Sequence, residues 1–561
     1  MSNGDGAEQP DAFALGLGRA SGAGRSGSCT DPRHRPGGVA SAVGSVGLMV
    51  HDEALLRAAE RASSWRESLS ERPVGVPVEP DELRARFDAV LPDRGEDAAA
   101  LVDELAVAVE PGLVATGGPR YFGFVTGGAL PAAAAADWLV SAFDQNSAAY
   151  VMSPACAVVE EIAARWVLEL LGLPGGAAVG FVTGGQMANV SCLAAARHAL
   201  LAAEGWDVEA DGLSGAPVPT VVIGEHAHST VIQALRLLGL GSARARRVAT
   251  DDQGRILPEE LRVALAATAG TALVCAQAGE VNTGAVDPLE AIADAASEHG
   301  RAWLHIDGAF GLWAAASPKR RSLVDGIERA DSWAVDGHKW LNVPYDCGMA
   351  IVRDPAAATA ALTVSAPYLA VDTRDPSAFT PESSRRARAV PVYAALRALG
   401  RHGVADLVER CCARARQAAD ELHRCPQVEV LNDVVLNQVL FRVHDVDTAT
   451  VVERVQREGT CWMAPPPGTT SPPSACRYRT GRPPRTTSAA RPARSRQPSR
   501  RARSSVARRR AVKTAGSPPR LRDSRPRWPA GRARPEAARS WSRVLVRTAS
   551  RPSTGSSRRC G

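Results

Sequence analysis

The stretch Ala330–Met349, which reads ADSWAVDGHKWLNVPYDCGM, decides the fold class of this chain. A lysine, Lys339, follows a histidine just after an apolar segment with the composition of a buried strand. Upstream, a second apolar segment ends at Asp307, within HIDGAFG (His305–Gly311). From about 177 to 355, short β-rich segments of this kind alternate with helical ones. This alternation predicts a mainly parallel sheet that is covered by helices on both faces.

A strand-end aspartate and a strand-end lysine form the pair that pyridoxal 5'-phosphate (PLP) chemistry needs. The lysine forms a Schiff base with the cofactor aldehyde, and the aspartate holds the pyridine nitrogen protonated so that the ring can accept electrons. A solvated surface lysine and a helix-capping aspartate are the simpler alternatives. The neighbours of Lys339, which include His338 and Trp340, and its spacing from Asp307 favour the cofactor roles.

A glycine turn offers a candidate phosphate site. The sequence TGGQMAN (Thr183–Asn189) lies between a predicted strand and a long predicted helix. Glycine lets the backbone approach an anion, and a helix N-terminus supplies unpaired N–H groups and a positive dipole end. The best candidates for phosphate contacts are therefore Gly184, Gly185 and Gln186.

Two further strand-to-helix turns carry polar candidates. In EHAHST (Glu225–Thr230), a histidine could stack on an aromatic cofactor or shuttle protons, and His228, immediately before the next helix, is a better candidate than His226. Histidines in such turns are more often hydrogen-bonded parts of the structure. In VNTGAVDP (Val281–Pro288), Thr283 is a weaker candidate for a hydrogen bond to cofactor or substrate.

The overall composition is that of a globular protein. The chain has 561 residues, enough for two or more domains, with 45% hydrophobic and 22% charged residues. No apolar run approaches the roughly 18 residues of a membrane span, and the N-terminus lacks a secretory signal pattern. The 11 cysteines have no metal-ligand spacing. We therefore predict a reduced, cytoplasmic protein without membrane contact or bound metal.

The chain divides into five predicted segments. Residues 1–48 are rich in Gly, Ser, Arg and Pro and are expected to be disordered, so Met49 is a candidate start. A helical segment is predicted at 49–150 and the PLP-binding large domain at 151–389. A small α+β domain is predicted at 390–463, where its pattern stops abruptly.

The last segment, 464–561, holds 25 Arg and 1 Lys against 1 Asp and 1 Glu, which gives it a net charge of +24. Because the whole chain carries +6, residues 1–463 carry a net charge of −18. Helix and strand signals vanish after Met463. The segment is either a disordered basic tail, a non-specific nucleic-acid binder or an out-of-frame translation. We favour the last, because suitable codons for Tyr478–Ser488 read in another frame as Ser-Asn-Trp-Ala-Thr-Thr-Glu-Asp-Asp-Val, a strand end before a helix N-terminus. The small domain would then be incomplete, with an exposed sheet edge.

Taken together, these motifs resemble the group II PLP-dependent amino-acid decarboxylases, the family of aromatic-L-amino-acid, histidine and glutamate decarboxylases, over roughly residues 80–463. The motifs are, in order, SPA at Ser153–Ala155, the Gly-Gly turn, AHS at Ala227–Ser229, NTGAVDP, HIDGAF and HKW. The resemblance implies PLP fold type I, with a mainly parallel seven-stranded large domain and a smaller α+β C-terminal domain. It also implies an obligate homodimer with the active site at the interface.

The resemblance further implies a role for each motif residue. Lys339 would form the Schiff base, Asp307 would pair with the pyridine nitrogen, and His228 would stack on the ring. Ala309 would lie against the opposite ring face, and Thr283 beside the ring substituents. The phosphate would be bound by Gly185, Gln186 and His338, with Gly184 in the same turn. The substrate side would hold Tyr121 and Phe122.

The implied reaction is decarboxylation of an L-amino acid to the amine and CO2. Family decarboxylases often use a loop tyrosine to protonate the α-carbon, whereas the corresponding segment AVDTRDPSAFTPESS here has none and holds Phe379 instead. Gln186-Met187 also departs from the small or hydroxylated residues usual in the phosphate turn. Transamination, or oxidative deamination to an aldehyde, therefore stays open, as does an inactive scaffold with a nucleic-acid-binding tail. The aromatic residues near Tyr121 hint at an aromatic substrate, but core packing explains them equally well.

Overall fold

The computed structural model describes residues 49–75, 78–88, 90–363, 375–465 and 475–479. The predicted disordered segment before Met49, the loop at 364–374 and most of the predicted tail lie outside the described residues. Among the described residues, no helix combines the length and the apolar composition needed to cross a bilayer.

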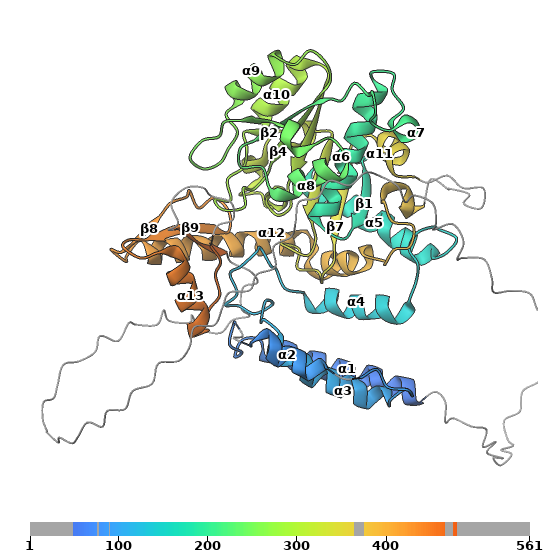
Figure 1. Ribbon diagram of the computed structural model, residues 1–561, viewed down its shortest axis with the longest axis vertical. Coiled ribbons are helices and arrows are strands. Elements are labelled where there is room, and N and C mark those ends of the chain that lie inside the picture. Colours follow the sequence, from blue (N-terminus) through green and yellow to red (C-terminus); the bar gives the residue numbers. More distant parts are fainter. Residues whose placement is uncertain (1–48, 76–77, 89, 364–374, 466–474, 480–561) are drawn as a thin grey trace, which may run out of the picture. The chain divides into compact units, whose positions relative to one another are not determined.

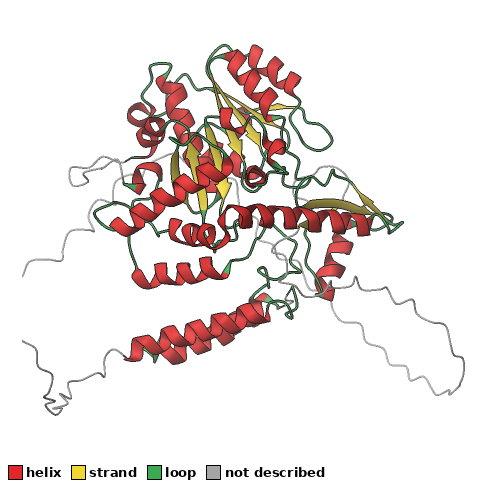
Figure 2. Ribbon diagram, turned by 180° about the vertical axis from the view of Figure 1, so that it is seen from behind, coloured by secondary structure: helices red, strands yellow, loops and turns green. Residues whose placement is uncertain are grey.

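A seven-stranded sheet forms the centre of the described chain (Figures 1 and 2). Its strand order is β1-β7-β6-β5-β4-β2-β3. The strands from β3 to β6 pair in parallel, whereas β7 is antiparallel to both β6 and β1. The expected mainly parallel α/β fold is therefore confirmed. The strands are β1 (Ala178–Val182), β2 (Thr220–Gly224), β3 (Arg246–Val248), β4 (Ala272–Gln277), β5 (Ala302–Asp307), β6 (Ser332–Asp336) and β7 (Gly348–Val352).

Helices cover both faces of this sheet, because successive strand residues point to opposite faces and nearly all are apolar. On β5, for example, Leu304 and Ile306 join one core cluster while Trp303 joins the other. The first face is packed by α5 (Pro154–Leu171), α9 (Pro258–Ala266), α10 (Leu289–His299) and α12 (Ala389–Leu422). The second is packed by α6 (Gly185–Ala202), α8 (Ser229–Leu237) and α11 (Pro355–Leu362).

The N-terminal part of the described chain is helical. Helices α1 and α3 pack side by side (Figure 1), joined by an ion pair of 2.7 Å between Arg61 Nε and Asp103 Oδ1. The segment Gly117–Leu130 then leads to the central sheet, where Leu130 donates its N–H to the Asn342 carbonyl. The helices of this part are α1 (Met49–Ser68), α2 (Pro80–Phe87), α3 (Ala98–Val109) and α4 (Pro131–Phe143). Outside this part, the short helix α7 (Val208–Asp211) follows α6.

The small C-terminal part is built on the end of α12 and a second sheet, in the order β10-β9-β8. Helix α12 has a kink at Gly400 (φ 63°), and β8 pairs antiparallel with β9. The segment 464–561, where helix and strand signals vanish from the sequence, contributes β10, which pairs antiparallel with β9, so β9 has a neighbour on both sides. The elements are β8 (Val428–Val430), β9 (Gln438–Val443), α13 (Thr448–Glu458) and β10 (Ala475–Arg479).

Candidate active site

The candidate site lies where the central parallel strands end. Asp307 is the last residue of β5 and Asp336 the last residue of β6. Gln277, at the end of β4, is the register partner of Asp307. Because parallel strands present their carboxyl ends at one edge of a sheet, residues far apart in the sequence converge there.

One pocket of about 260 Å³ at this edge gathers most of the predicted residues. The predicted residues that line it are Gly184, Gly185, Gln186, His228, Asp307, Ala309, His338 and Lys339. The other lining residues are Val125, Thr230, Gln277, Gly279, Val281, Phe310 and Asp336. The pocket therefore joins the glycine turn, the histidine turn and both strand ends.

Asp336 is the ionisable residue of the pocket lining that the sequence analysis missed. Its side chain is 1% exposed, and its Oδ2 lies 2.7 Å from the Lys339 Nζ. Its Oδ1 accepts a hydrogen bond of 2.6 Å from the Gly185 N–H, at the start of α6. The carboxylate thus connects the lysine to the glycine turn. A signal was present, because an aspartate ends β6 just as Asp307 ends β5.

His338 lies against the glycine turn. A Cβ on Gly184 would lie 3.1 Å from His338 Cε1, and a Cβ on Gly185 would lie 2.8 Å from the Asp336 carboxylate. Glycine at both positions therefore lets the turn approach His338 and Asp336 this closely, and the helix start can offer N–H groups other than that of Gly185 to an anion. The His338 ring contacts the Tyr345 ring at a centroid distance of 4.4 Å. Burial lowers the pKa of His338.

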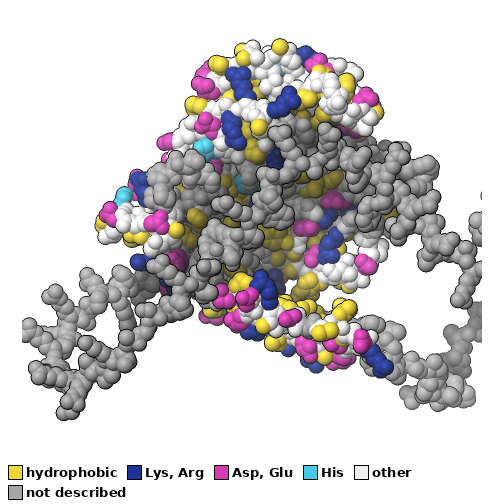
Figure 3. Space-filling view, in the orientation of Figure 1, with side chains coloured by type: hydrophobic (Ala, Val, Ile, Leu, Met, Phe, Trp, Pro, Cys, Tyr) yellow, Lys and Arg dark blue, Asp and Glu magenta, His cyan; other side chains and the backbone are white. Residues whose placement is uncertain are grey.

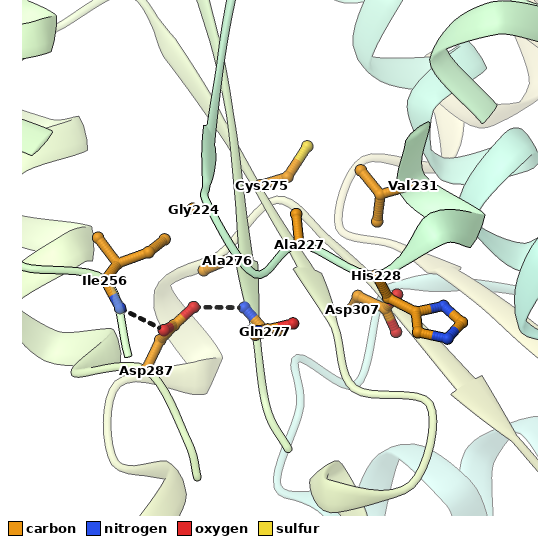
Figure 4. A pocket seen from close by; sticks show the side chains of 10 residues that line it. All are labelled: Gly224, Ala227, His228, Val231, Ile256, Cys275, Ala276, Gln277, Asp287 and Asp307. Carbon is orange, nitrogen blue, oxygen red and sulfur yellow. Dashed lines mark hydrogen bonds between the residues drawn. The ribbon is translucent and has the colours of Figure 1, made fainter. Parts of the chain in front are cut away.

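Asp307 is surrounded by hydrogen-bond donors. Its Oδ2 accepts from Asn189 Nδ2 at 3.1 Å, and its Oδ1 accepts from the Ala309 N–H at 3.2 Å. Thr230 Oγ1 lies 3.4 Å from the same Oδ2 and 2.8 Å from Nδ1 of His228, whose ring lies beside Asp307 (Figure 4). A carboxylate that only accepts suits a protonated ring nitrogen. With an amine, such a carboxylate and an anion cradle in one pocket, the residues fit PLP.

Thr283 does not line this pocket. Its hydroxyl donates to the Gln253 carbonyl at 2.7 Å, and its N–H donates to Glu280. The turn that holds it is anchored by Asp287, whose carboxylate accepts from the Ile256 and Gln277 N–H groups (Figure 4). Burial raises the pKa of Asp287 to about 7.

Tyr121 and Phe122 also lie outside the pocket lining. The Tyr121 ring stacks on Trp462 at a centroid distance of 4.8 Å, and the Phe122 N–H donates to the Trp462 carbonyl. Burial, and to a lesser degree Tyr345, raises the pKa of Tyr121 to about 12. From the same segment it is Val125 that lines the pocket. Position along the sequence could not show that Val125, rather than Tyr121 or Phe122, lines the pocket.

Phe379, the residue noted in place of a loop tyrosine, is outside the pocket lining as well. It packs against the core cluster of the α6 face, and its carbonyl oxygen lies 2.0 Å from where a Cβ on Gly180 would stand. The preceding loop residues, 364–374, are outside the described residues.

The buried histidine of β5 makes stability depend on pH. Burial lowers the pKa of His305 from 6.5 to about 4, opposed by the charge of Asp307. At this histidine the unfolded chain therefore binds more protons between these values, so the contribution of His305 to stability is fully present above pH 6.5 and falls as the pH approaches 4. We expect a loss of up to about 3 kcal/mol in the free energy of unfolding. Urea unfolding of the natural protein and of His305→Gln across this pH range should show it as a difference, because Asp287, with its raised pKa, acts in the opposite direction in both proteins.

The control for this pH dependence is a pair of substitutions. His305→Gln should remove most of that pH-dependent loss, whereas His402→Gln, at an exposed position on α12, should leave it unchanged. Equal slopes of stability against pH in His305→Gln and the natural protein would contradict the assignment.

Comparison with known proteins tests the chemistry that this geometry suggests. Residues 80–444 match the family described as the pyridoxal-dependent decarboxylase conserved domain. The chain belongs to this family. The family and its relatives show that the protein is a PLP-dependent amino-acid decarboxylase, a carboxy-lyase.

Individual relatives differ in the substrate that their names give. The chain is 29% identical to an aromatic-L-amino-acid decarboxylase of Bacillus atrophaeus, over 67% of this chain and 78% of the relative. It is 30% identical to an acidic amino acid decarboxylase of Bos taurus, over 70% of this chain and 74% of the relative. The crystal structure of the Oryza sativa TDC with PLP and tryptamine has a TM-score of 0.72 at 26% identity, over 78% of this chain and 95% of that one. This likeness confirms the expected fold type I for the decarboxylase.

Proposed function

We propose that this decarboxylase removes the α-carboxyl group of an aromatic L-amino acid and releases the amine and CO2, with the cofactor held on Lys339. The observation that carries the proposal is the convergence of Lys339, Asp307 and the glycine turn in one pocket. When bound, PLP supplies the electron sink that takes up the electrons of the broken bond to the carboxyl carbon.

Each pocket residue has a task in this proposal. Lys339 Nζ would hold the cofactor covalently until the substrate amine replaces it. Asp307 would accept from the protonated ring nitrogen, and His228 would stack on the ring. N–H groups of the α6 N-terminus other than that of Gly185, with His338, would hold the phosphate. Asp336 keeps the lysine at the glycine turn through its 2.7 Å contact.

The charge of the pocket favours an aromatic over an acidic substrate. Its described lining includes two carboxylates, Asp307 and Asp336, and no arginine, and Lys339 is already paired. An acidic side chain would therefore find repulsion without a bidentate partner. Val125 lines the pocket, and its neighbour Phe124 contacts the Trp462 ring, with the two ring centroids 5.2 Å apart.

The experiment is a substrate panel with product analysis. We expect the protein with PLP to release CO2 and amine from L-tryptophan, L-tyrosine or L-phenylalanine, and little from L-glutamate, L-aspartate or cysteine sulfinate. Release of CO2 only from the acidic compounds would refute the substrate class. A keto acid or an aldehyde as the main product would favour the transamination or oxidative alternative.

We also propose that the enzyme is a homodimer that uses its N-terminal helices as part of the interface. Large apolar side chains are exposed on them, and Figure 3 shows hydrophobic side chains among charged ones on this helical part. On α3, Leu101 is 50% and Leu105 53% exposed. Such surface is usually buried against a partner. A second copy is the natural partner because the chain supplies identical faces.

We expect Leu101→Glu with Leu105→Glu to weaken association by roughly a hundredfold or more, because burying each leucine contributes about 1.5–3 kcal/mol. Light scattering across a dilution series would measure the dissociation constant. Asp420→Lys, at an exposed position on α12 and outside the N-terminal helices, is the control and should associate normally. A double variant that dimerises as tightly as the natural protein would exclude this surface from the interface.

A further inference from the structure

Behind Asp307 lies a chain of buried polar side chains that the proposed chemistry leaves unexplained. Asn189 on α6 contacts both Asp307 and His305, with Oδ1 of Asn189 2.9 Å from His305 Nε2. Nδ1 of His305 lies 2.9 Å from Ser332 Oγ, which also accepts from Trp303 Nε1 at 2.9 Å. Asn189, His305 and Ser332 are each 0% exposed, and polar groups buried so completely must be paired with one another.

The hydrogen bonds of this buried network run in one direction, each group donating to the next. Trp303 donates its indole N–H to the Ser332 oxygen, and Nδ1 of His305, at 2.9 Å, is the acceptor within reach of the serine's own proton. The histidine therefore carries its proton on Nε2 and donates it to Asn189 Oδ1. A neutral imidazole is required, and burial lowers the pKa of His305 to about 4.

The direction of the chain decides which atom of Asn189 faces Asp307. Because the amide oxygen accepts from His305, the amide nitrogen must donate to Asp307 Oδ2, at 3.1 Å. The other side-chain donor, Thr230, has one hydroxyl proton and two acceptors, Asp307 and His228. Asn189 is thus the side chain that donates to Asp307 whichever way the threonine turns.

We propose that Asn189, oriented by His305 and Ser332, is a positioning residue that fixes the Asp307 carboxylate as an acceptor for the protonated ring nitrogen of PLP. The inference rests on the proposed role of Asp307. It adds a directional network of four side chains, from β5, β6 and α6, that meets the pocket at Asp307 and, through a second hydrogen bond of 3.0 Å from Asn189 Nδ2, at Thr230 Oγ1.

The test measures the cofactor rather than turnover. PLP labelled with 15N in the ring is bound to the full-length protein, and its ring-nitrogen NMR signal and dissociation constant are measured. We expect Asn189→Leu to move the signal toward that of the unprotonated ring and to weaken binding roughly tenfold or more, the contribution of one hydrogen bond to a charged group. Ser191→Ala, on the same helix and equally buried, donates only to the Met187 carbonyl and is the control, with both values unchanged.

Two milder variants keep the test decisive if Asn189→Leu fails to fold. Ser332→Ala removes the donor that sets the His305 tautomer and should shift the ring-nitrogen signal in the same direction. In His305→Gln the glutamine amide can both accept and donate hydrogen bonds, so the ring nitrogen should keep most of its protonated NMR signal. A folded Asn189→Leu or Ser332→Ala protein with unchanged signal and affinity would overturn the inference. Absence of any PLP on Lys339 in the natural protein would instead overturn the proposed function.

Discussion

Lys339→Ala is expected to abolish covalent cofactor binding and to lower decarboxylation by roughly a thousandfold or more, because the amine that holds PLP and exchanges it for the substrate is removed. The visible absorption of the protein with PLP should lose the band of the lysine-bound cofactor. Borohydride reduction, followed by peptide mapping, should find no modified lysine in the pocket.

The composition of the chain makes this experiment unusually clear. It has only three lysines, Lys319, Lys339 and Lys513, so the labelled peptide identifies the site with few alternatives. Lys319→Arg is the matched control and should keep both the absorption band and the reduced adduct. An adduct that persists in Lys339→Ala at the natural stoichiometry would show that another amine carries the cofactor.

Asp307→Ala is expected to have the second largest effect. Without the carboxylate, the end of β5 loses its charged acceptor for the ring nitrogen, so the ring becomes a poorer electron sink. We expect decarboxylation to fall by roughly a hundredfold or more, the usual cost of removing one preorganised electrostatic group. The variant should still form the borohydride-reducible link, because Lys339 is untouched.

The control for this variant is another carboxylate of the same sheet. Asp331, at the amino end of β6, accepts the Leu304 N–H at 2.8 Å and does not line the pocket. Asp331→Asn should therefore reduce stability at most and leave the rate per bound cofactor unchanged. Equal losses of rate in both variants would indicate a general structural defect rather than a role of Asp307 at the ring.

Much of the site was predictable because its signals are local. Apolar runs of strand length that end in Asp307 or lead to Lys339, and a glycine pair before a helix, are visible within a few residues of sequence. The same local logic placed Thr283 among the candidates, since it lies in a strand-to-helix turn. Its hydroxyl, however, is bound by Gln253, a residue of another turn.

The sequence by itself determined the α/β class, the lysine and aspartate at the strand ends, and the glycine turn, because strand periodicity and turn chemistry are properties of neighbouring residues. The tertiary structure alone decided that the Asp336 carboxylate meets the Gly185 N–H and that β10 continues the second sheet. It alone also decided that Asn189 meets Asp307 across 118 positions of sequence. Such contacts depend on strand register and on how α6 lies across the sheet. Register and helix placement follow from packing of the whole core, which no short segment encodes.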